Sequence, residues 1–278
     1  MSGTTNVVGI IGWPVDRSLS PVIHDAAFEA LGMPWVYVPF PVRPGQVREA
    51  VEGLAALGVK GANVTMPHKT EVAGLCHERS EDAERLRAVN TLELSGGIVR
   101  GHNTDAPGFE RFLRRDAGFD PAGKSALLYG AGGGARACAL ALVRGGLARL
   151  TVAVRDPGRA GDLLTAVEGA GPGTVEVIAW GDAAGWRGDL AVDATPLGSD
   201  GLGSPPEPAY SPDLLVVDLK YHPPLTPLQV RAREGGATAF GGLGLLLQQA
   251  ALSFELWTGR PAPLEVMSAA ALGALAQD

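Results

Sequence analysis

The sequence predicts an α/β protein of two domains, in which the last helices pack back on the first domain. The first indication is length, because 278 residues exceed the ~100–200 residues of a single domain. The second is the alternation of strand-like and helix-like segments through both halves of the chain. The third is a glycine-rich turn between a strand and a helix at residues 130–135. With 39 glycines and 21 prolines but no regular repeat, the chain is typical of a globular protein rich in tight turns.

Composition and charge argue against several classes of protein. No run of ~18 apolar residues occurs, so no membrane-spanning helix is expected. The first residues lack the basic segment of a signal peptide, and we expect a cytoplasmic protein with no membrane partner. The formal net charge of −7 provides no basic footprint for nucleic acid. Cys76 and Cys138 lie outside any C-x-x-C pattern and are expected to be free thiols in a reducing compartment.

The first hundred residues predict alternating strands and helices. Apolar strands are expected at Val7–Ile11, Trp35–Phe40 and Gly61–Thr65. A first helix begins at Ser20-Pro21, where a cap residue precedes proline at the first helical position, and Val47–Leu57 predicts a second. Ser95-Gly96-Gly97 is expected to join Val89–Leu94 and Ile98–Gly101 in a hairpin.

A second unit is predicted from about Asp105 onward. It opens with a helix at Pro107–Ala117. Short strands follow at Ser125–Tyr129, Leu150–Val154, Val175–Ala179, Leu190–Ala194 and Leu214–Leu219. The first of these strands, a loop, a helix to about Arg144 and the next strand form the right-handed crossover of a parallel sheet. The Ala- and Leu-rich end of the chain predicts helices at about Gly244–Thr258 and Pro263–Ala276.

The glycine-rich turn is typical of a dinucleotide-binding loop. It consists of Gly130, Ala131, Gly132, Gly133, Gly134 and Ala135, with Ala135 where a strict G-x-G-x-x-G motif has its third glycine. Only glycine turns this tightly and lets backbone N–H groups approach a pyrophosphate at the positive end of the following helix. The sequence therefore predicts a Rossmann-type domain, with a plain tight turn as the alternative.

The end of the next strand bears on which dinucleotide binds. Arg155 and Arg159 can clamp a 2′-phosphate, as NADP requires. Asp156 would repel that phosphate, or could itself bind a ribose hydroxyl, as NAD requires. The alternatives are an exposed turn without a ligand and a glycine-loop methyltransferase, although the two arginines would be poor partners for a ribose diol. We favour NADP over NAD.

Polar residues also follow an apolar strand of the first domain. Asn63 and Thr65 are two residues apart, so their side chains share one face. Lys69 brings a cation to the carboxyl end of this strand, where α/β sheets bind ligands. Asp105 stands at a helix start, a position that favours an acidic side chain, and a Lys–Asp pair can transfer protons. For Asp105 and Ser20 a helix cap is the alternative interpretation.

Eight motifs occur in order along nearly the whole chain. They are Gly12–Pro21 with His24, Asn63–Lys69, Ala88–Leu92, Gly101–Asp105, Gly130–Ala137, Asp193–Gly198, Asp218–Pro223 with Thr226–Leu228, and Gly242–Gln249. Together they closely resemble the motifs of the shikimate dehydrogenases. The resemblance implies an NADP-dependent oxidoreductase that reversibly reduces 3-dehydroshikimate to shikimate, on the route to chorismate and the aromatic amino acids. It also implies a substrate domain at 1–105 and 243–278 and an NADP-binding Rossmann domain at 106–242.

The resemblance assigns residues by matched position. Lys69 and Asp105 would be the catalytic pair at the substrate, and Ser18 and Ser20 would bind its carboxylate. The substrate hydroxyls would be bound by Asn63, Thr65, Asn90 and Gln249, with Tyr221 nearby. The cofactor would contact the loop from Gly130 to Ala135 together with Arg155, Arg159, Thr195, Leu219 and Gly242, the last two along the nicotinamide half.

The chain departs from the family pattern at four positions. Arg17 replaces the usual histidine, and Asp193 stands where asparagine is common. Val154 and Asp156 replace the Asn and Thr that usually flank the arginine at the position of Arg155. The last pair keeps open an NAD-preferring quinate/shikimate dehydrogenase as an alternative.

Two further expectations concern class and partners. A non-catalytic NADP-sensing regulatory protein is the alternative of another class, but a sensor would need neither Lys69 nor Asp105. The five histidines lack the spacing of zinc ligands, so no metal is expected. The expected partner is a small-molecule substrate, and a homodimer is the assembly considered.

Overall fold

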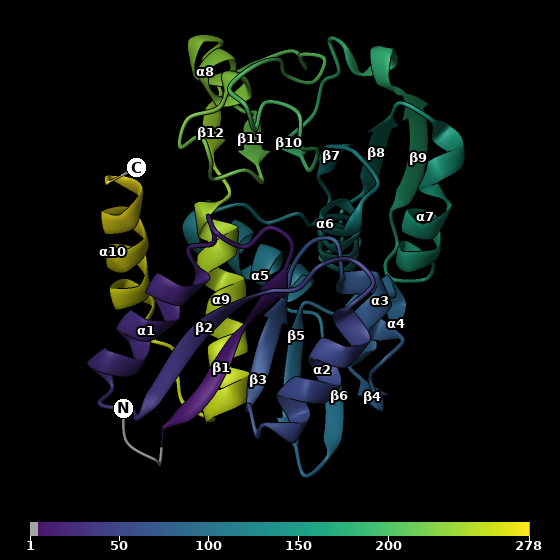
Figure 1. Ribbon diagram of the computed structural model, residues 1–278. Helices are drawn as coiled ribbons and strands as arrows, with labels where there is room; N and C mark the ends of the chain where they lie inside the picture. Colours follow the sequence, from purple (N-terminus) through teal and green to yellow (C-terminus); the bar gives the residue numbers. More distant parts are fainter. Residues whose placement is uncertain (1–4, 278) are drawn as a thin grey trace. The chain divides into compact units, whose positions relative to one another are not determined.

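The protein is described by a computed structural model over residues 5–277. These residues divide into two compact units (Figure 1). One unit comprises the chain up to Thr104 together with the chain from Leu247 onward, and the other is Asp105–Leu246. Both are α/β, as the sequence predicts.

The sheet of the first unit combines parallel and antiparallel pairs. Its strands are β1 (Asn6–Gly12), β2 (Trp35–Pro41), β3 (Gly61–Val64), β4 (Glu78–Arg79), β5 (Thr91–Ser95) and β6 (Ile98–His102). They lie in the order β2-β1-β3-β5-β6-β4. β1 pairs in parallel with β2 and β3, whereas β5 runs antiparallel to both β3 and β6. The predicted hairpin is confirmed, and its turn places Gly96 and Gly97 at φ values of 59° and 80°, which glycine tolerates.

Helices cover this sheet, and they include helices from the last part of the chain. They are α1 (Ser20–Ala30), α2 (Val47–Ala56), α3 (Lys69–Ala73), α4 (Glu81–Leu86), α10 (Leu264–Leu275) and the part of α9 (Leu243–Thr258) from Leu247 on. α1 packs beside α10 (Figure 1). Phe28 of α1 also stacks on Phe254 of α9 at 5.3 Å between ring centres. The last helices therefore pack back on the first unit, as predicted.

The sheet of the second unit is doubly wound and parallel. Its strands are β7 (Ser125–Tyr129), β8 (Arg149–Val154), β9 (Thr174–Ala179), β10 (Leu190–Asp193), β11 (Leu215–Asp218) and β12 (Thr238–Phe240). They lie in the order β12-β11-β10-β7-β8-β9, with every pair parallel. Counted from β7, this is the 3-2-1-4-5-6 order of the Rossmann fold, whose crevice opens where the strand order reverses, between β7 and β10.

Alternating side chains of these strands enter separate cores on the two faces of the sheet. Leu128 and Val192 enter one core with α6, whereas Leu127, Tyr129 and Ala191 enter the other. The helices are α5 (Asp105–Arg111), α6 (Gly133–Arg144), α7 (Gly161–Val167) and α8 (Pro227–Glu234).

The predicted helix at Pro107–Ala117 is wrong in its bounds and uniformity. α5 begins two residues earlier, at Asp105, and ends at Arg111, where a π-helical turn over Phe112–Asp116 follows. The strands β4 and β12 and the short helices α3, α4, α7 and α8 were not predicted, because such short elements repeat no apolar period.

Candidate active site

Asn63 lies at the centre of a buried group of polar side chains in the first unit. Its Oδ1 accepts a hydrogen bond from the Tyr37 phenol at 2.7 Å. Its Nδ2 group lies 2.9 Å from Ser253 Oγ, 3.1 Å from Thr91 Oγ1 and 3.2 Å from the Asn90 carbonyl. The amide is thus held from β2, β5 and α9, and its Oδ1 keeps one lone pair for a ligand.

Asn90 joins this group to Thr104 and Gln249. Its Oδ1 accepts a hydrogen bond from the Thr104 backbone N–H at 2.7 Å. Its Nδ2 donates to Thr104 Oγ1 at 2.9 Å and to Gln249 Oε1 at the longer distance of 3.4 Å. We call Tyr37, Asn63, Asn90, Thr91, Thr104, Gln249 and Ser253 the Asn63 cluster. It brings together the predicted site residues Asn63, Asn90 and Gln249.

The surroundings of Tyr37 keep its phenol protonated and leave His24 uncharged. His24 is fully buried and stacks on Tyr37 with ring centres 4.5 Å apart. Within residues 5–277 neither ring nitrogen of His24 has a hydrogen-bond partner, and burial lowers the pKa of His24 to about 3. Burial also raises the pKa of the Tyr37 phenol. At neutral pH His24 is therefore uncharged and Tyr37 remains a donor.

Lys69 is connected by a backbone hydrogen bond to the segment that carries Asn90 of the Asn63 cluster. It is the first residue of α3 and is half-buried. Its carbonyl accepts a hydrogen bond from the Val89 N–H at 2.9 Å, which ties α3 to the segment that carries Asn90. Thr65 is also half-buried, directly after β3, and its N–H donates to the Ile11 carbonyl at 2.9 Å. The carboxyl end of β3 is therefore followed by the hydroxyl of Thr65 and the cation of Lys69, as the sequence predicts.

The two serines lie at the start of α1. Ser20 is buried and is the first residue of the helix, with Leu19 in the N-cap position. The interpretation of Ser20 as the helix cap is therefore wrong. Ser18 is half-buried, and its Oγ accepts a weak hydrogen bond from the Ser20 N–H at 3.3 Å.

Asp105 and Tyr221 belong to the second unit. Asp105 opens α5, is half-buried and directly follows Thr104 of the Asn63 cluster in the chain. Tyr221 follows β11, and burial raises the pKa of its phenol.

The glycine-rich loop fits a dinucleotide. Gly130 has a φ of 99°, which glycine tolerates, and a Cβ at this position would lie 3.2 Å from Thr195 Cγ2 across the crevice between β7 and β10. Gly132 is the N-cap of α6, whose first turn is capped by no side chain within the described residues. A Cβ at Gly132 or Gly133 would meet no atom of residues 5–277 within 4 Å. Backbone N–H groups there can face a pyrophosphate.

Asp156 is engaged in its own turn. Its Oδ1 accepts a hydrogen bond from the Gly158 N–H at 3.0 Å and so caps the short helical turn Pro157–Ala160. Arg155 and Arg159 flank it, are exposed, and form no ion pair with another residue of 5–277. The carboxylate is thus used locally, while two guanidinium groups remain for a phosphate.

Comparison with known proteins decides the family. The family described as Shikimate dehydrogenase substrate binding domain matches residues 10–92, and Shikimate 5'-dehydrogenase C-terminal domain matches residues 242–272. A Methanopyrus kandleri protein named shikimate dehydrogenase (NADP(+)) is 45% identical over 96% of this chain and 95% of its own length. The chain belongs to the shikimate dehydrogenase family.

Solved structures of shikimate dehydrogenases have the same fold. One in complex with NADP+ is 33% identical, with a TM-score of 0.90 over 99% of this chain and 97% of its own. The Thermus thermophilus enzyme in complex with NADP(H) and shikimate is 33% identical, with a TM-score of 0.87 over 97% of this chain and all of its own.

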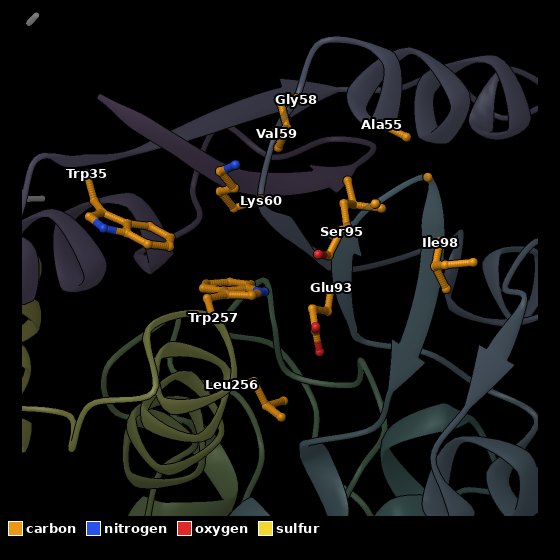
Figure 2. A pocket seen from close by; sticks show the side chains of 13 residues that line it. Trp35, Ala55, Gly58, Val59, Lys60, Glu93, Ser95, Ile98, Leu256 and Trp257 are labelled. Atoms are coloured by element: carbon orange, nitrogen blue, oxygen red, sulfur yellow. The ribbon is translucent and has the colours of Figure 1, made fainter. Parts of the chain in front are cut away.

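A cavity elsewhere in the first unit is separate from the candidate site. It has a volume of about 350 Å³ and is lined by residues that include Trp35, Lys60, Glu93 and Trp257 (Figure 2). Lys60 immediately precedes β3, whereas Thr65 and Lys69 follow it, so the cavity lies at the opposite end of that strand. No site residue assigned by the family resemblance lines it.

Sequence reasoning missed several members of the site. Ser253 lies four residues after Gln249, hence on the same face of α9, and that spacing is the signal that could have revealed it. Tyr37 gave no such signal, because its partners Asn63 and His24 lie on other elements. Among the described residues no group of His, Cys, Asp and Glu is arranged to hold a metal, and no helix is long and apolar enough to span a membrane.

Proposed function

We propose that the chain is an NADP-dependent shikimate dehydrogenase, which reversibly reduces 3-dehydroshikimate to shikimate on the route to the aromatic amino acids. The observation that carries the proposal is the Asn63 cluster, together with the backbone hydrogen bond that ties Lys69 to the segment carrying Asn90, in a chain of this family. Neutral amides and hydroxyls suit a substrate rich in hydroxyl groups, and the lysine supplies the cation that the reacting oxygen needs.

The substrate residues divide by chemistry. Ser18 and Ser20 would bind the carboxylate, with the Ser20 N–H already directed toward Ser18 Oγ. Thr65, Asn90 and Gln249 would bind hydroxyls, together with the remaining lone pair of Asn63, and Tyr221 is a further residue that the family resemblance assigns to the substrate. Because Asn63 is bonded on both ends of its amide, it also fixes the position of Asn90 and Ser253.

Lys69 and Asp105 are proposed as the catalytic pair. When NADP(H) is bound, it supplies the hydride acceptor or donor. The Lys69 ammonium would stabilise the negative charge that develops on the reacting oxygen and give it a proton during reduction. Asp105 would hold and orient this ammonium. In the direction of oxidation the same pair would accept the hydroxyl proton.

Cofactor binding is assigned to the second unit, and most of the substrate residues lie in the first. Gly130, Gly132 and Gly133 would hold the pyrophosphate, with Ala131, Gly134 and Ala135 completing the loop. Arg155 and Arg159 would hold the 2′-phosphate that distinguishes NADP from NAD. Asp156 does not stand against this assignment, because its carboxylate caps its own turn. Leu219 and Gly242 would lie along the nicotinamide half, and Thr195 would line the cofactor cleft.

Location and assembly remain proposals as well. We propose a cytoplasmic enzyme without nucleic-acid partners, with a homodimer as the assembly to test. Light scattering of the purified chain would give its mass in solution, and a monomer mass would contradict the dimer.

The test of the function is reduction of NADP by shikimate, followed by absorbance at 340 nm. We expect a rise that requires both compounds and reverses with NADPH and 3-dehydroshikimate. No change in either direction would contradict the proposed activity, and NADP binding without turnover would favour the sensing protein instead.

A further inference from the structure

Lys220 lies between two buried carboxylates in the second unit. Asp193 ends β10 and Asp218 ends β11, and the parallel register places them opposite each other. Both are fully buried. Lys220 Nζ lies 2.7 Å from Asp193 Oδ2 and 2.8 Å from Asp218 Oδ1, and it also donates to the Thr195 carbonyl at 3.0 Å. We call Asp193, Lys220 and Asp218 the Lys220 cluster.

The remaining carboxylate oxygens are also bonded. Asp193 Oδ1 accepts hydrogen bonds from the Thr195 N–H at 2.9 Å and from its hydroxyl at 2.7 Å. Asp218 Oδ2 accepts one from the Thr226 hydroxyl at 2.6 Å. Burial raises the pKa of Asp193, and the Lys220 ammonium opposes that rise. Without the ammonium, two adjacent buried carboxylates would face each other unpaired.

The Lys220 cluster connects three segments of the cofactor half. Thr195 is held by Asp193 and by the Lys220 ammonium. The Leu219 N–H donates to the Asp193 carbonyl at 3.0 Å, and the Gly242 N–H donates to the Lys220 carbonyl at 2.8 Å. A Cβ on Gly242 would lie 1.9 Å from the Leu219 carbonyl oxygen, so the two segments approach as closely as only glycine allows.

We propose that Lys220 is a positioning residue for the nicotinamide half of the cofactor. It pairs with both Asp193 and Asp218 and thereby fixes Leu219 and Gly242, which are assigned to that half, together with Thr195 of the cofactor cleft. The inference rests on the proposed function, because it takes NADP as the cofactor. It also explains the charge at Asp193, where the family commonly has asparagine: in this chain the additional carboxylate is paired with a lysine from the neighbouring strand end.

The test measures binding rather than turnover, with Lys220→Met as the main variant. We expect the dissociation constant of NADP to rise at least ~10-fold, because the loops lose the charge that fixes them. Binding of 2′,5′-ADP, which lacks the nicotinamide half, should change less than about twofold. A merely structural role would weaken both ligands alike, and equal weakening would overturn the proposal.

The double variant Asp193→Asn/Lys220→Met supplies the rescue. It removes one of the two facing charges, so it should recover most of the NADP affinity lost in Lys220→Met, and it remains informative if the single variant does not fold. Lys124→Met is the matched control, because Lys124 forms an exposed ion pair with Asp189 at 3.1 Å in the same unit. We expect less than about a twofold change for this control.

The outcomes separate this proposal from the proposed function. A wild-type chain that binds NADP, together with a Lys220→Met variant that binds it equally well, overturns the role of Lys220 alone. A double variant no better than the single variant does the same. A wild-type chain that does not bind NADP overturns the proposed function, and the role of Lys220 with it.

Discussion

The two units carry polar clusters of opposite kinds. The Asn63 cluster contains amides, hydroxyls and a phenol, and its neighbour His24 is neutral as well. The Lys220 cluster contains two carboxylates and an ammonium, all deeply buried. Neutral groups cost little to bury once they are hydrogen-bonded, whereas buried charges must be paired with each other.

This difference in charge corresponds to a difference in role. The Asn63 cluster is suited to bind a ligand, and the Lys220 cluster is suited to hold loops in position. The Asn63 cluster contains long contacts of 3.4 and 3.5 Å to Gln249 Oε1, which a substrate hydroxyl can replace at little cost. In the Lys220 cluster every carboxylate oxygen is bonded to the protein, so the cluster fixes loops and offers no unbonded carboxylate oxygen to a ligand.

The largest effect should come from the cation beside the neutral cluster. We expect Lys69→Ala to lower kcat by ~10²–10⁴-fold with a smaller change in KM, because a general acid–base group is removed. Steady-state kinetics with shikimate and NADP would measure this. Lys60→Ala is the control, since Lys60 lines the cavity at the other end of β3 and should leave kcat within about twofold. An unchanged kcat in Lys69→Ala would refute the catalytic assignment.

The next effect concerns the stability of the neutral cluster itself. Asn63→Ala leaves Tyr37, Ser253 and Thr91 without their shared partner, so we expect a loss of about 2–4 kcal/mol in the free energy of unfolding. Ser253→Ala should cost only about 1 kcal/mol, because Asn63 keeps its other partners. Urea unfolding would measure both, and equal losses would show that Asn63 is not the centre of the cluster.

A smaller effect concerns pH. Burial holds the pKa of His24 at about 3, below its ordinary value of 6.5. Between these values the unfolded chain binds a proton that the folded chain does not, so stability falls as the pH drops below 6.5. His24→Phe should remove about 2 kcal/mol of the loss in unfolding free energy between pH 7 and pH 5. The same pH dependence in both proteins would mean that His24 is charged or hydrated in the fold.

The smallest effect is expected at the cofactor turn. Asp156 caps its own turn, so Asp156→Ala should change the ratio of kcat/KM for NADP to that for NAD by less than about threefold. Arg155→Ala is the contrasting variant and should lower that ratio at least ~10-fold, because a charge-assisted contact to the phosphate is lost. A large gain in NADP preference from Asp156→Ala would show instead that this carboxylate opposes the phosphate.

The sequence predicted the elements that have a repeating apolar pattern and those that contain a recognisable motif. Alternating apolar strands and the glycine loop predicted both sheets, because burial of strands and the approach of backbone to phosphate each demand particular residues. α8 was not predicted because polar residues make up half of it, so no repeating apolar pattern marks the face that is buried. The π-helical turn after Arg111 escaped because apolar spacing does not distinguish it from the helix that precedes it.

Residues of the candidate site could be predicted where several of them lie close together in the sequence. Asn63, Thr65 and Lys69 lie within seven positions of one another in the chain. Tyr37 and Ser253 act through contacts with residues 26 and 190 positions away, which only the folded chain reveals. Lys220 escaped for the same reason: its role depends on the register that sets Asp193 opposite Asp218.

The most direct test of the account compares kcat/KM for shikimate with NADP, shikimate with NAD, and quinate with either cofactor. The account predicts the highest value for shikimate with NADP, by at least ~10-fold over each other pairing, since the arginine pair favours the phosphate. A higher value for quinate with NAD would contradict it.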